Sequence, residues 1–230
     1  MKTRILYEDE AIYVIYKPAG IAVQASRIGE MDVEHELLNY SVRKDKNAYV
    51  GIVHRLDQPV EGVLVVARTK QVASQLSKQL LDSVLNKKYH VISYVSHSKK
   101  TLTTSETWIS LEDYMLKKGK ISVVVPSQTP DAKIALLRYK LLDQREETAF
   151  LDVEIQTGRF HQIRTQFASR NLPIVGDMKY GTEQSLEYSK KQGIKTVALC
   201  AYQISFVHPV TRKSMEFSIR SENPAFLQYS

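Results

Sequence analysis

The chain has 230 residues, of which 43% are hydrophobic and 25% charged, as in an ordinary soluble globular protein. No stretch approaches the roughly 18 consecutive apolar residues of a membrane span, and the acidic start of the chain predicts no secretory signal. A net charge of +7 is compatible with a polyanionic partner. The single cysteine, Cys200, excludes an internal disulfide framework, so a cytoplasmic location is expected.

Hydrophobic patterning predicts many short strands and few helices. In chain order, the expected elements are strands at 12–16 and 63–67, a helix at 71–84, strands at 89–95, 121–125, 136–142 and 150–155, a helix at 160–170 and a strand at 197–206. In the first helix, Val72, Leu76 and Leu80 stand four residues apart and share one face. In the strand at 150–155, polar Asp152 and Glu154 alternate with apolar residues, as in a half-buried strand.

This order of elements predicts the α+β class, built around a largely antiparallel sheet. No repeat, low-complexity tract or shift of composition marks a domain boundary. Residues 1–230 are therefore expected to form a single catalytic domain.

The densest polar cluster lies at residues 53–62, directly before the strand expected at 63–67. It holds His54, Arg55 and Asp57 within four residues, and Pro59 and Gly62 indicate a loop. Functional residues concentrate in loops that rigid elements support. The same residues also fit a surface turn with a local Asp–Arg ion pair, which stabilises little.

A second polar cluster opens the helix expected at 160–170. Arg159 and His161 are expected near its first turn, where a phosphate can bind. Arg164 stands beside the apolar stripe and is expected to point partly inward, where a guanidinium needs an anionic partner. The alternative interpretation is a solvated basic face.

A third candidate is Tyr89, which follows Lys87 and Lys88 at the start of an expected strand. A tyrosine in this position fits ordinary amphipathic packing. It also fits a stacking platform for an unpaired base. Both interpretations stay open at this point.

Several common chemistries lack their sequence signals. The six histidines form no His-x-x-x-His pair and no carboxylate–histidine spacing typical of zinc. The sequence has neither a Gly-rich phosphate loop nor a Gly-x-Ser-x-Gly elbow. Nothing therefore points to a nucleotide cofactor or to a required metal.

Five motifs occur in one order over nearly the whole chain. They are Lys17-Pro-Ala-Gly20 after an opening strand pair, His54-Arg-Leu-Asp57 followed by Gly62, Lys88-Tyr89, Gly158-Arg-Phe-His-Gln-Ile-Arg164 with the loop 173–181 behind it, and a closing strand with a His-Pro turn at 199–209. This set resembles the RluA-type family of RNA pseudouridine synthases. Five motifs in family order make the resemblance specific.

The resemblance implies the pseudouridine synthase catalytic fold, a mixed, largely antiparallel sheet with flanking helices and a central RNA-binding cleft. The implied reaction detaches uracil from a specific uridine of ribosomal or transfer RNA, turns it and rejoins it through carbon. Nothing is oxidised and nothing leaves, so no cofactor and no metal are expected. The expected partner is RNA, with no membrane, and the protein is expected to be a monomer. Because the catalytic opening begins at about residue 5, the extra N-terminal RNA-binding domain of some members is expected to be absent.

The resemblance also implies roles for single residues. Asp57 matches the family's catalytic aspartate, and Arg164 matches the guanidinium that keeps it ionised. Tyr89 matches the active-site tyrosine that packs on the base. Arg55 matches the arginine that fills the gap left by the extruded base, and His54 of the same motif is expected to contact RNA. The remaining candidates for contacts with RNA are Lys17, Arg159 and His161.

Four positions, at three places in the chain, depart from the family pattern. Val60-Glu61 stands where threonine and serine are common, Gln166 stands where a histidine is common, and Cys200 replaces another frequent histidine. Glu61 adds a negative charge near the active loop, which leaves the substrate open. Two other function classes are kept: a catalytically inactive RNA-binding protein of the same fold, and a metal-independent nuclease that uses His54 or His161 as acid and base.

Overall fold

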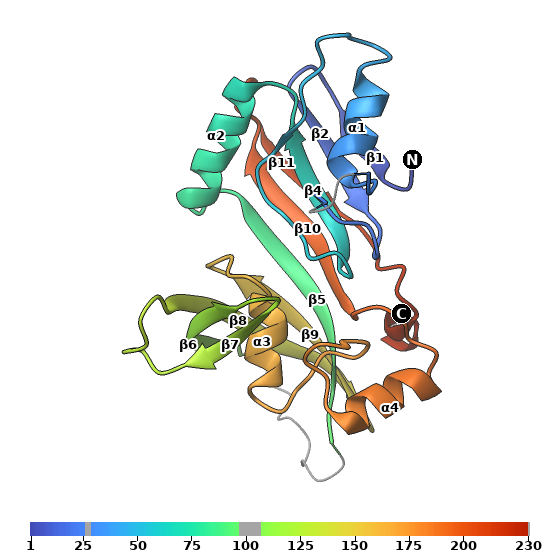
Figure 1. The fold of residues 1–230 in the computed structure, drawn as a ribbon, viewed down its shortest axis with the longest axis vertical. Coiled ribbons are helices and arrows are strands. Elements are labelled where there is room, and N and C mark those ends of the chain that lie inside the picture. Colours follow the sequence, from blue (N-terminus) through green and yellow to red (C-terminus); the bar gives the residue numbers. More distant parts are fainter. Residues whose placement is uncertain (26–28, 97–106, 230) are drawn as a thin grey trace. The chain divides into compact units, whose positions relative to one another are not determined.

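The computed structural model describes residues 1–25, 29–96 and 107–229, and the chain forms two compact units (Figure 1). Unit 1 comprises Met1–Lys87 and Ala201–Ser221, and unit 2 comprises Lys88–Cys200 and Glu222–Ser230. The chain passes from one unit to the other inside strands β5 (Asn86–Tyr94) and β10 (Leu199–Val207). The expectation of a single domain over residues 1–230 stays a prediction.

Unit 1 combines an antiparallel group of strands with two helices. Its further elements are β1 (Arg4–Glu8), β2 (Ile12–Lys17), α1 (Val33–Ser41), β3 (Gly51–Ile52), β4 (Glu61–Ala67), α2 (Lys70–Leu81) and β11 (Ser214–Ser218). The strand order is β1-β2-β4-β10, with β11 beside β10 and β3 beside β4. β2 pairs antiparallel with both β1 and β4, and every residue of β2 and β4 is buried. Val72 and Leu76 of α2 belong to the same buried cluster as Val63 and Val65 of β4, which forms the core of this unit.

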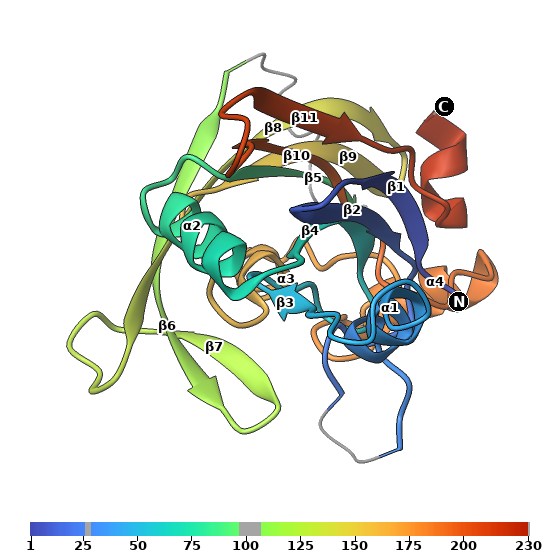
Figure 2. The same ribbon diagram turned by 90° about the horizontal axis from the view of Figure 1, so that it is seen from above.

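Unit 2 is a second antiparallel group of strands. Besides β5 it contains β6 (Ile109–Lys118), β7 (Ile121–Val125), β8 (Lys133–Arg145), β9 (Thr148–Ile155), α3 (Gln162–Ala168), α4 (Glu183–Lys191) and the 3-10 helix η1 (Pro224–Tyr229). The strand order is β5-β9-β8-β6-β7, with antiparallel pairing at each step. The light-green hairpin of β6 and β7 is clear in Figure 2. Helix α3, buried over residues 162–167, contacts both strands of this hairpin.

The α+β class with largely antiparallel strands is confirmed, and so are the seven strands and two helices expected from the sequence, with shifts at their ends. Helix α3 begins at Gln162, two residues later than expected, because His161 has a left-handed φ of 54°. Helix α2 ends at Leu81, three residues earlier than expected, and Ser83 beyond it also has a positive φ, of 57°. In the described ranges, no helix is long and apolar enough to cross a membrane.

Candidate active site

The loop before β4 carries Asp57, and apolar anchors fix it on both sides of this residue. Leu56 is 8% exposed and Val60 is 1% exposed. The Val60 N–H donates to the Asp57 carbonyl oxygen at 3.0 Å, which closes a tight turn. Asp57 is half-buried, and Arg55 is exposed. The loop is thus held rigidly while the carboxylate keeps some access to solvent.

Lys17 ties this loop to the Lys17–Gly20 turn. Its ammonium donates to the carbonyl oxygens of Pro18 at 3.0 Å, Ile21 at 2.8 Å and Gln58 at 3.2 Å, and the residue has no exposed surface. An ammonium has three N–H donors, so these three bonds use all of them. Gly20 adds a pair of hydrogen bonds, because its N–H donates to the Gln58 carbonyl oxygen at 2.8 Å and its own carbonyl accepts from the Gln58 amide at 3.2 Å. The burial of Lys17 gives its ammonium a structural role in supporting the turn that carries Asp57.

The charge of Lys17 depends on two carboxylates of unit 1. Burial lowers the pKa of Lys17 from 10.5 to about 7, and the negative charges of Asp57 and Glu61 oppose this shift. Asp57 and Glu61 therefore lie near enough to stabilise the ammonium.

Glu61, the departure from the family pattern, is a buried carboxylate with fixed partners. It is 3% exposed, and its Oε2 accepts a hydrogen bond from the Tyr16 hydroxyl at 2.7 Å. Its Oε1 accepts a hydrogen bond from the Ser221 hydroxyl. The Glu61 carboxylate thus points into the protein, where two hydroxyl groups donate to it and the positive charge of Lys17 lies nearby.

His54 faces the core of unit 1. It is 7% exposed, and its Nε2 accepts a hydrogen bond from the Val65 N–H of β4 at 3.2 Å. Burial, with a smaller effect from the charge of Lys87, lowers the pKa of His54 well below 6.5. The ring is therefore neutral near pH 7 and carries its proton on Nδ1, which has no hydrogen-bond partner among the described residues. His54 thus anchors the start of the loop to the backbone of β4.

In unit 2, the buried Arg164 has its anionic partner in Asp177. The guanidinium donates from Nε to Oδ2 at 2.7 Å and from Nη2 to Oδ1 at 2.8 Å. The Tyr180 ring centroid lies 5.1 Å from the guanidinium carbon of Arg164. The sequence predicted that Arg164 points inward and needs an anion, and both features are present. Asp57 belongs to unit 1, so its pairing with Arg164 stays a prediction.

The start of α3 orients Arg159 and His161. Gln162 caps this region, because its Oε1 accepts from the Arg159 N–H at 2.9 Å and from the Thr157 hydroxyl at 2.8 Å. The Arg159 guanidinium donates to the Ile134 carbonyl oxygen at 2.7 Å. His161 is 8% exposed, and its Nδ1 lies 2.8 Å from the Tyr180 hydroxyl.

Tyr89 lies on β5 opposite Val153 of β9 and is 5% exposed. Tyr89 is thus buried. Two of the departures from the family pattern, Gln166 and Cys200, are buried as well. Gln166 donates to Asp113 Oδ2 at 2.7 Å and to the Ala135 carbonyl oxygen at 3.3 Å, which ties α3 to β6 and β8. Cys200 has no exposed surface.

The sequence did not indicate that Asp177 would pair with Arg164, or that Lys17 would support the loop of Asp57. Asp177 stands in the motif after α3, but 13 positions separate it from Arg164, and spacing alone does not pair them. A buried lysine leaves no pattern that distinguishes it from an exposed one. Among the described residues, no three His, Cys, Asp or Glu side chains gather into a group that could hold a metal ion.

Comparisons with known proteins show the family of the chain. A family model described as RNA pseudouridylate synthase matches residues 11–169. An uncharacterized RNA pseudouridine synthase of Mycoplasma pneumoniae is 32% identical over 215 residues, which cover 93% of this chain and 65% of the relative. The chain thus spans just under two thirds of the length of that relative. The tRNA pseudouridine synthase C of Vibrio vulnificus is 31% identical over 235 residues, covering 95% of this chain and 89% of the relative.

A solved structure has the same fold. The human RNA pseudouridylate synthase domain containing 4 superposes with a TM-score of 0.74 at 23% sequence identity. The match covers 98% of this chain and 90% of the human chain.

Proposed function

The chain belongs to the RluA-type family of RNA pseudouridine synthases, and on this premise we propose that it isomerises a specific uridine of ribosomal or transfer RNA to pseudouridine. The observation that carries the proposal is Asp57, a half-buried carboxylate on a loop that Lys17 and two apolar anchors hold in place. A protein that only bound RNA would have no use for an anion presented in this way, because RNA is itself anionic.

Asp57 is proposed to act on the ribose of the target nucleotide. In one route it attacks the sugar or stabilises a cationic sugar, as carboxylates do in glycosidases. In the other it takes a proton from the second carbon of the sugar while the bond to uracil breaks, so that uracil leaves with the bonding electron pair and a glycal remains. Both routes place the carboxylate next to the sugar, and the loop that Lys17 supports holds it there.

Two buried residues of unit 2 complete the proposed catalytic set. Arg164, whose guanidinium plane is fixed by Asp177, is proposed to supply the positive charge that catalysis by Asp57 requires. Tyr89 is proposed to pack on the uracil and to assist the late removal of a proton from the ring carbon.

Three of the residues proposed to serve RNA binding are proposed to contact RNA directly, and two to act indirectly. Arg55 is exposed and is proposed to fill the gap left by the flipped base, a step that costs a few kcal/mol and less in loops. Arg159 and His161 are proposed to contact the RNA backbone from the start of α3. His54 and Lys17, both buried, are proposed to act through the backbone of the loop that they support. The protein is proposed to act in the cytoplasm as a monomer, without a cofactor.

The test is chemical mapping of pseudouridine with a carbodiimide in total RNA from cells that lack the protein. One or more sites are expected to disappear and to return when the purified protein is added to the unmodified RNA. The Asp57→Asn variant is expected to bind this RNA with unchanged affinity and to restore no site.

Other outcomes would identify the other function classes. Full activity of Asp57→Asn would refute the assignment of the carboxylate. Unchanged maps in the cells, with RNA binding by the wild type, would favour an inactive RNA-binding protein. Cleavage of the RNA would favour the nuclease.

A further inference from the structure

Phe160 is an aromatic side chain at the protein surface, next to the start of α3. It is 38% exposed. Its ring stacks on His161 with the ring centroids 3.8 Å apart and an interplanar angle of 23°. The ammonium of Lys117, on β6, lies 4.8 Å from the centroid of the Phe160 ring. An exposed phenylalanine between an imidazole and an ammonium has no role in the core of unit 2.

His161, on which the Phe160 ring stacks, is held in place by a hydrogen bond. The His161 Nδ1 lies 2.8 Å from the Tyr180 hydroxyl, and this hydroxyl accepts a hydrogen bond from the Ser122 N–H of β7 at 2.7 Å. His161 itself is 8% exposed. The stacked pair is therefore preorganised, so a flat ligand that binds to Phe160 orders little else.

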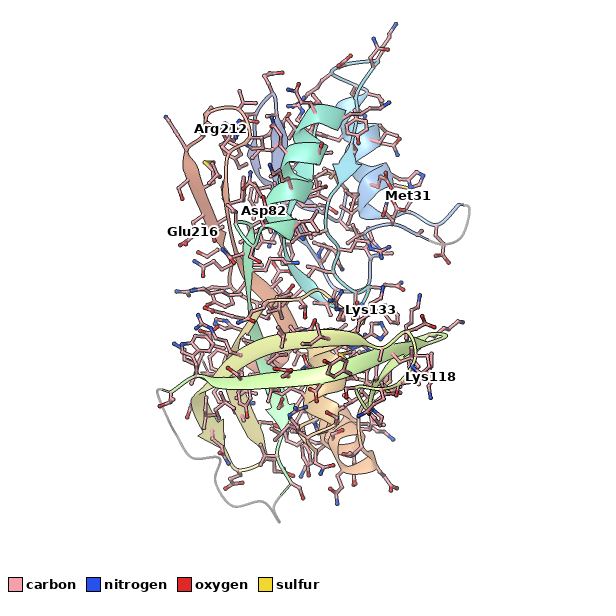
Figure 3. All side chains as sticks on the ribbon, turned by 90° about the vertical axis from the view of Figure 1, so that its left-hand side faces the viewer. Met31, Asp82, Lys118, Lys133, Arg212 and Glu216 are labelled. Atoms are coloured by element: carbon pink, nitrogen blue, oxygen red, sulfur yellow. The ribbon has the colours of Figure 1, made fainter. Side chains whose placement is uncertain are left out.

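The surface beside Phe160 is cationic. Between residues 114 and 125 the β6–β7 hairpin carries three lysines and no acidic residue. Figure 3 shows Lys118 at the end of this hairpin and Lys133 on the neighbouring strand β8. The three hairpin lysines are exposed, namely Lys117, Lys118 and Lys120. The Lys179 ammonium donates to the Lys120 carbonyl oxygen at 3.2 Å, which brings one more cation to the end of the hairpin.

We propose that Phe160, backed by His161, is a stacking platform for an unpaired base of the RNA substrate, and that the hairpin lysines bind the phosphates of the same strand. The proposal rests on the function proposed above, since RNA is the ligand. Aromatic rings between cations are the usual means of holding single-stranded nucleic acid. A cation over an exposed ring is worth less than a stacked base, so an incoming base displaces Lys117, whose long side chain then reaches a phosphate.

The binding test uses two 12-nucleotide probes, an oligoadenylate and an abasic ribose-phosphate strand of the same length. Phe160→Leu is expected to weaken oligoadenylate binding roughly 5- to 100-fold and to leave abasic binding unchanged. Phe160→Trp is expected to keep the affinity. The matched control is Leu227→Ala, because Leu227 is 71% exposed on η1 of the same unit; its affinities are expected to equal those of the wild type.

A spectroscopic readout checks stacking directly. Trp108 is the sole tryptophan of the chain, so Phe160→Trp in a Trp108→Phe background has one indole, at the proposed platform. Its fluorescence is expected to be quenched by oligoadenylate and not by the abasic strand. Equal oligoadenylate affinity of Phe160→Leu and the wild type, or an indole that neither probe quenches, would overturn the platform.

The two proposals fail separately. If the wild type restores pseudouridine while Phe160→Leu binds both probes normally, the platform alone is wrong. If Phe160→Leu loses oligoadenylate affinity while the wild type forms no pseudouridine in any RNA, the platform is supported and the proposed function is wrong.

Discussion

Arg164 and Asp177 form a bidentate ion pair inside unit 2, with N–O distances of 2.7 and 2.8 Å and side chains that are 3% and 0% exposed. The carboxylate also accepts the Lys179 N–H at 3.0 Å, so the loop after α3 is arranged around it. Two parallel hydrogen bonds fix the plane of the guanidinium as well as its position. The guanidinium of Arg164, which is proposed to serve catalysis, is thus positioned by the carboxylate of Asp177 in the same unit.

Replacing this carboxylate by an amide should destabilise the protein strongly. Asp177→Asn keeps the shape of the side chain but leaves the Arg164 cation buried without its counter-ion, at an expected cost of about 3–5 kcal/mol. The free energy of unfolding, measured in urea, tests this. Asp143→Asn is the control, because Asp143 and its partner Arg145 are both 51% exposed and little change is expected there. Equal effects of the two substitutions would contradict the assigned importance of the buried pair.

Lys17 should give the protein a stability that rises with pH. Its folded pKa is about 7 and its ordinary value is 10.5, so between these two pH values the unfolded chain binds more protons than the folded one. The cost of burying the charged ammonium is fully present below pH 7 and is relieved as the pH rises toward 10.5, by about 1.4 kcal/mol per pH unit at most. Lys17→Gln keeps N–H donors and does not titrate. The difference in unfolding free energy between wild type and variant is expected to grow in favour of the wild type from pH 7 to 10, and a constant difference would disprove this.

Removing the charge of Glu61 should make Lys17 lose its proton more easily. Glu61→Gln keeps one oxygen to accept from the Tyr16 or the Ser221 hydroxyl and turns an NH2 group toward the other, which can accept from it. It removes one of the two charges that support the Lys17 ammonium. The pKa of Lys17 is expected to fall, because Glu61 raises it in the wild type, and the alkaline limb of the pH profile of pseudouridine formation should move the same way. NMR titration of the Lys17 side chain measures the first effect.

The control for this charge is Glu216→Gln, since Glu216 is exposed on β11 (Figure 3). Its Lys17 titration and pH profile should match those of the wild type. A Glu61→Gln variant that lowers activity equally at every pH would indicate a packing defect instead.

Gly62 should not tolerate a side chain. Its φ is +150°, and an added Cβ would lie 2.5 Å from the Cβ of Ala201 and 2.7 Å from its carbonyl oxygen. Relief requires β4 to move away from Ala201, so Gly62→Ala is expected to cost on the order of 3 kcal/mol. Gly158→Ala is the matched control, because a Cβ there meets nothing within 4 Å. Thermal unfolding should separate the two variants clearly, and similar melting temperatures would refute the close approach.

Much of the fold is predictable from the sequence because the strands alternate or are uniformly apolar. Two helices that patterning does not indicate bury polar residues. Helix α1 buries Glu36, whose carboxylate accepts the N–H groups of Lys2 and Thr3 at 2.8 and 2.9 Å. Helix α4 buries Ser185 and Ser189, and the Ser189 hydroxyl accepts the Gly176 N–H. Such helices are stabilised by long-range partners, which a periodicity of apolar residues does not reveal.

The same limit applies to the site. The sequence indicates which residues matter through motifs, and it indicates that Arg164 needs an anion. It does not choose among the acidic residues, since the choice of Asp177 depends on the loop after α3. Glu61 is recognisable as a departure, but its partner Ser221 is 160 positions away, so its inward orientation follows only from the folded chain.

The two segments of each unit are synthesised at different times, because neither unit is continuous in the chain. Unit 1 begins with residues 1–87 but gains β10 and β11 only after residues 88–200 have emerged, a delay on the order of ten seconds during translation. Until then β4, whose seven residues are all buried in the finished protein, has no β10 neighbour. During that interval the nascent chain should expose the unpaired, apolar edge of β4 to chaperones. A ribosome stalled before residue 200 would carry a unit 1 that lacks β10 and β11.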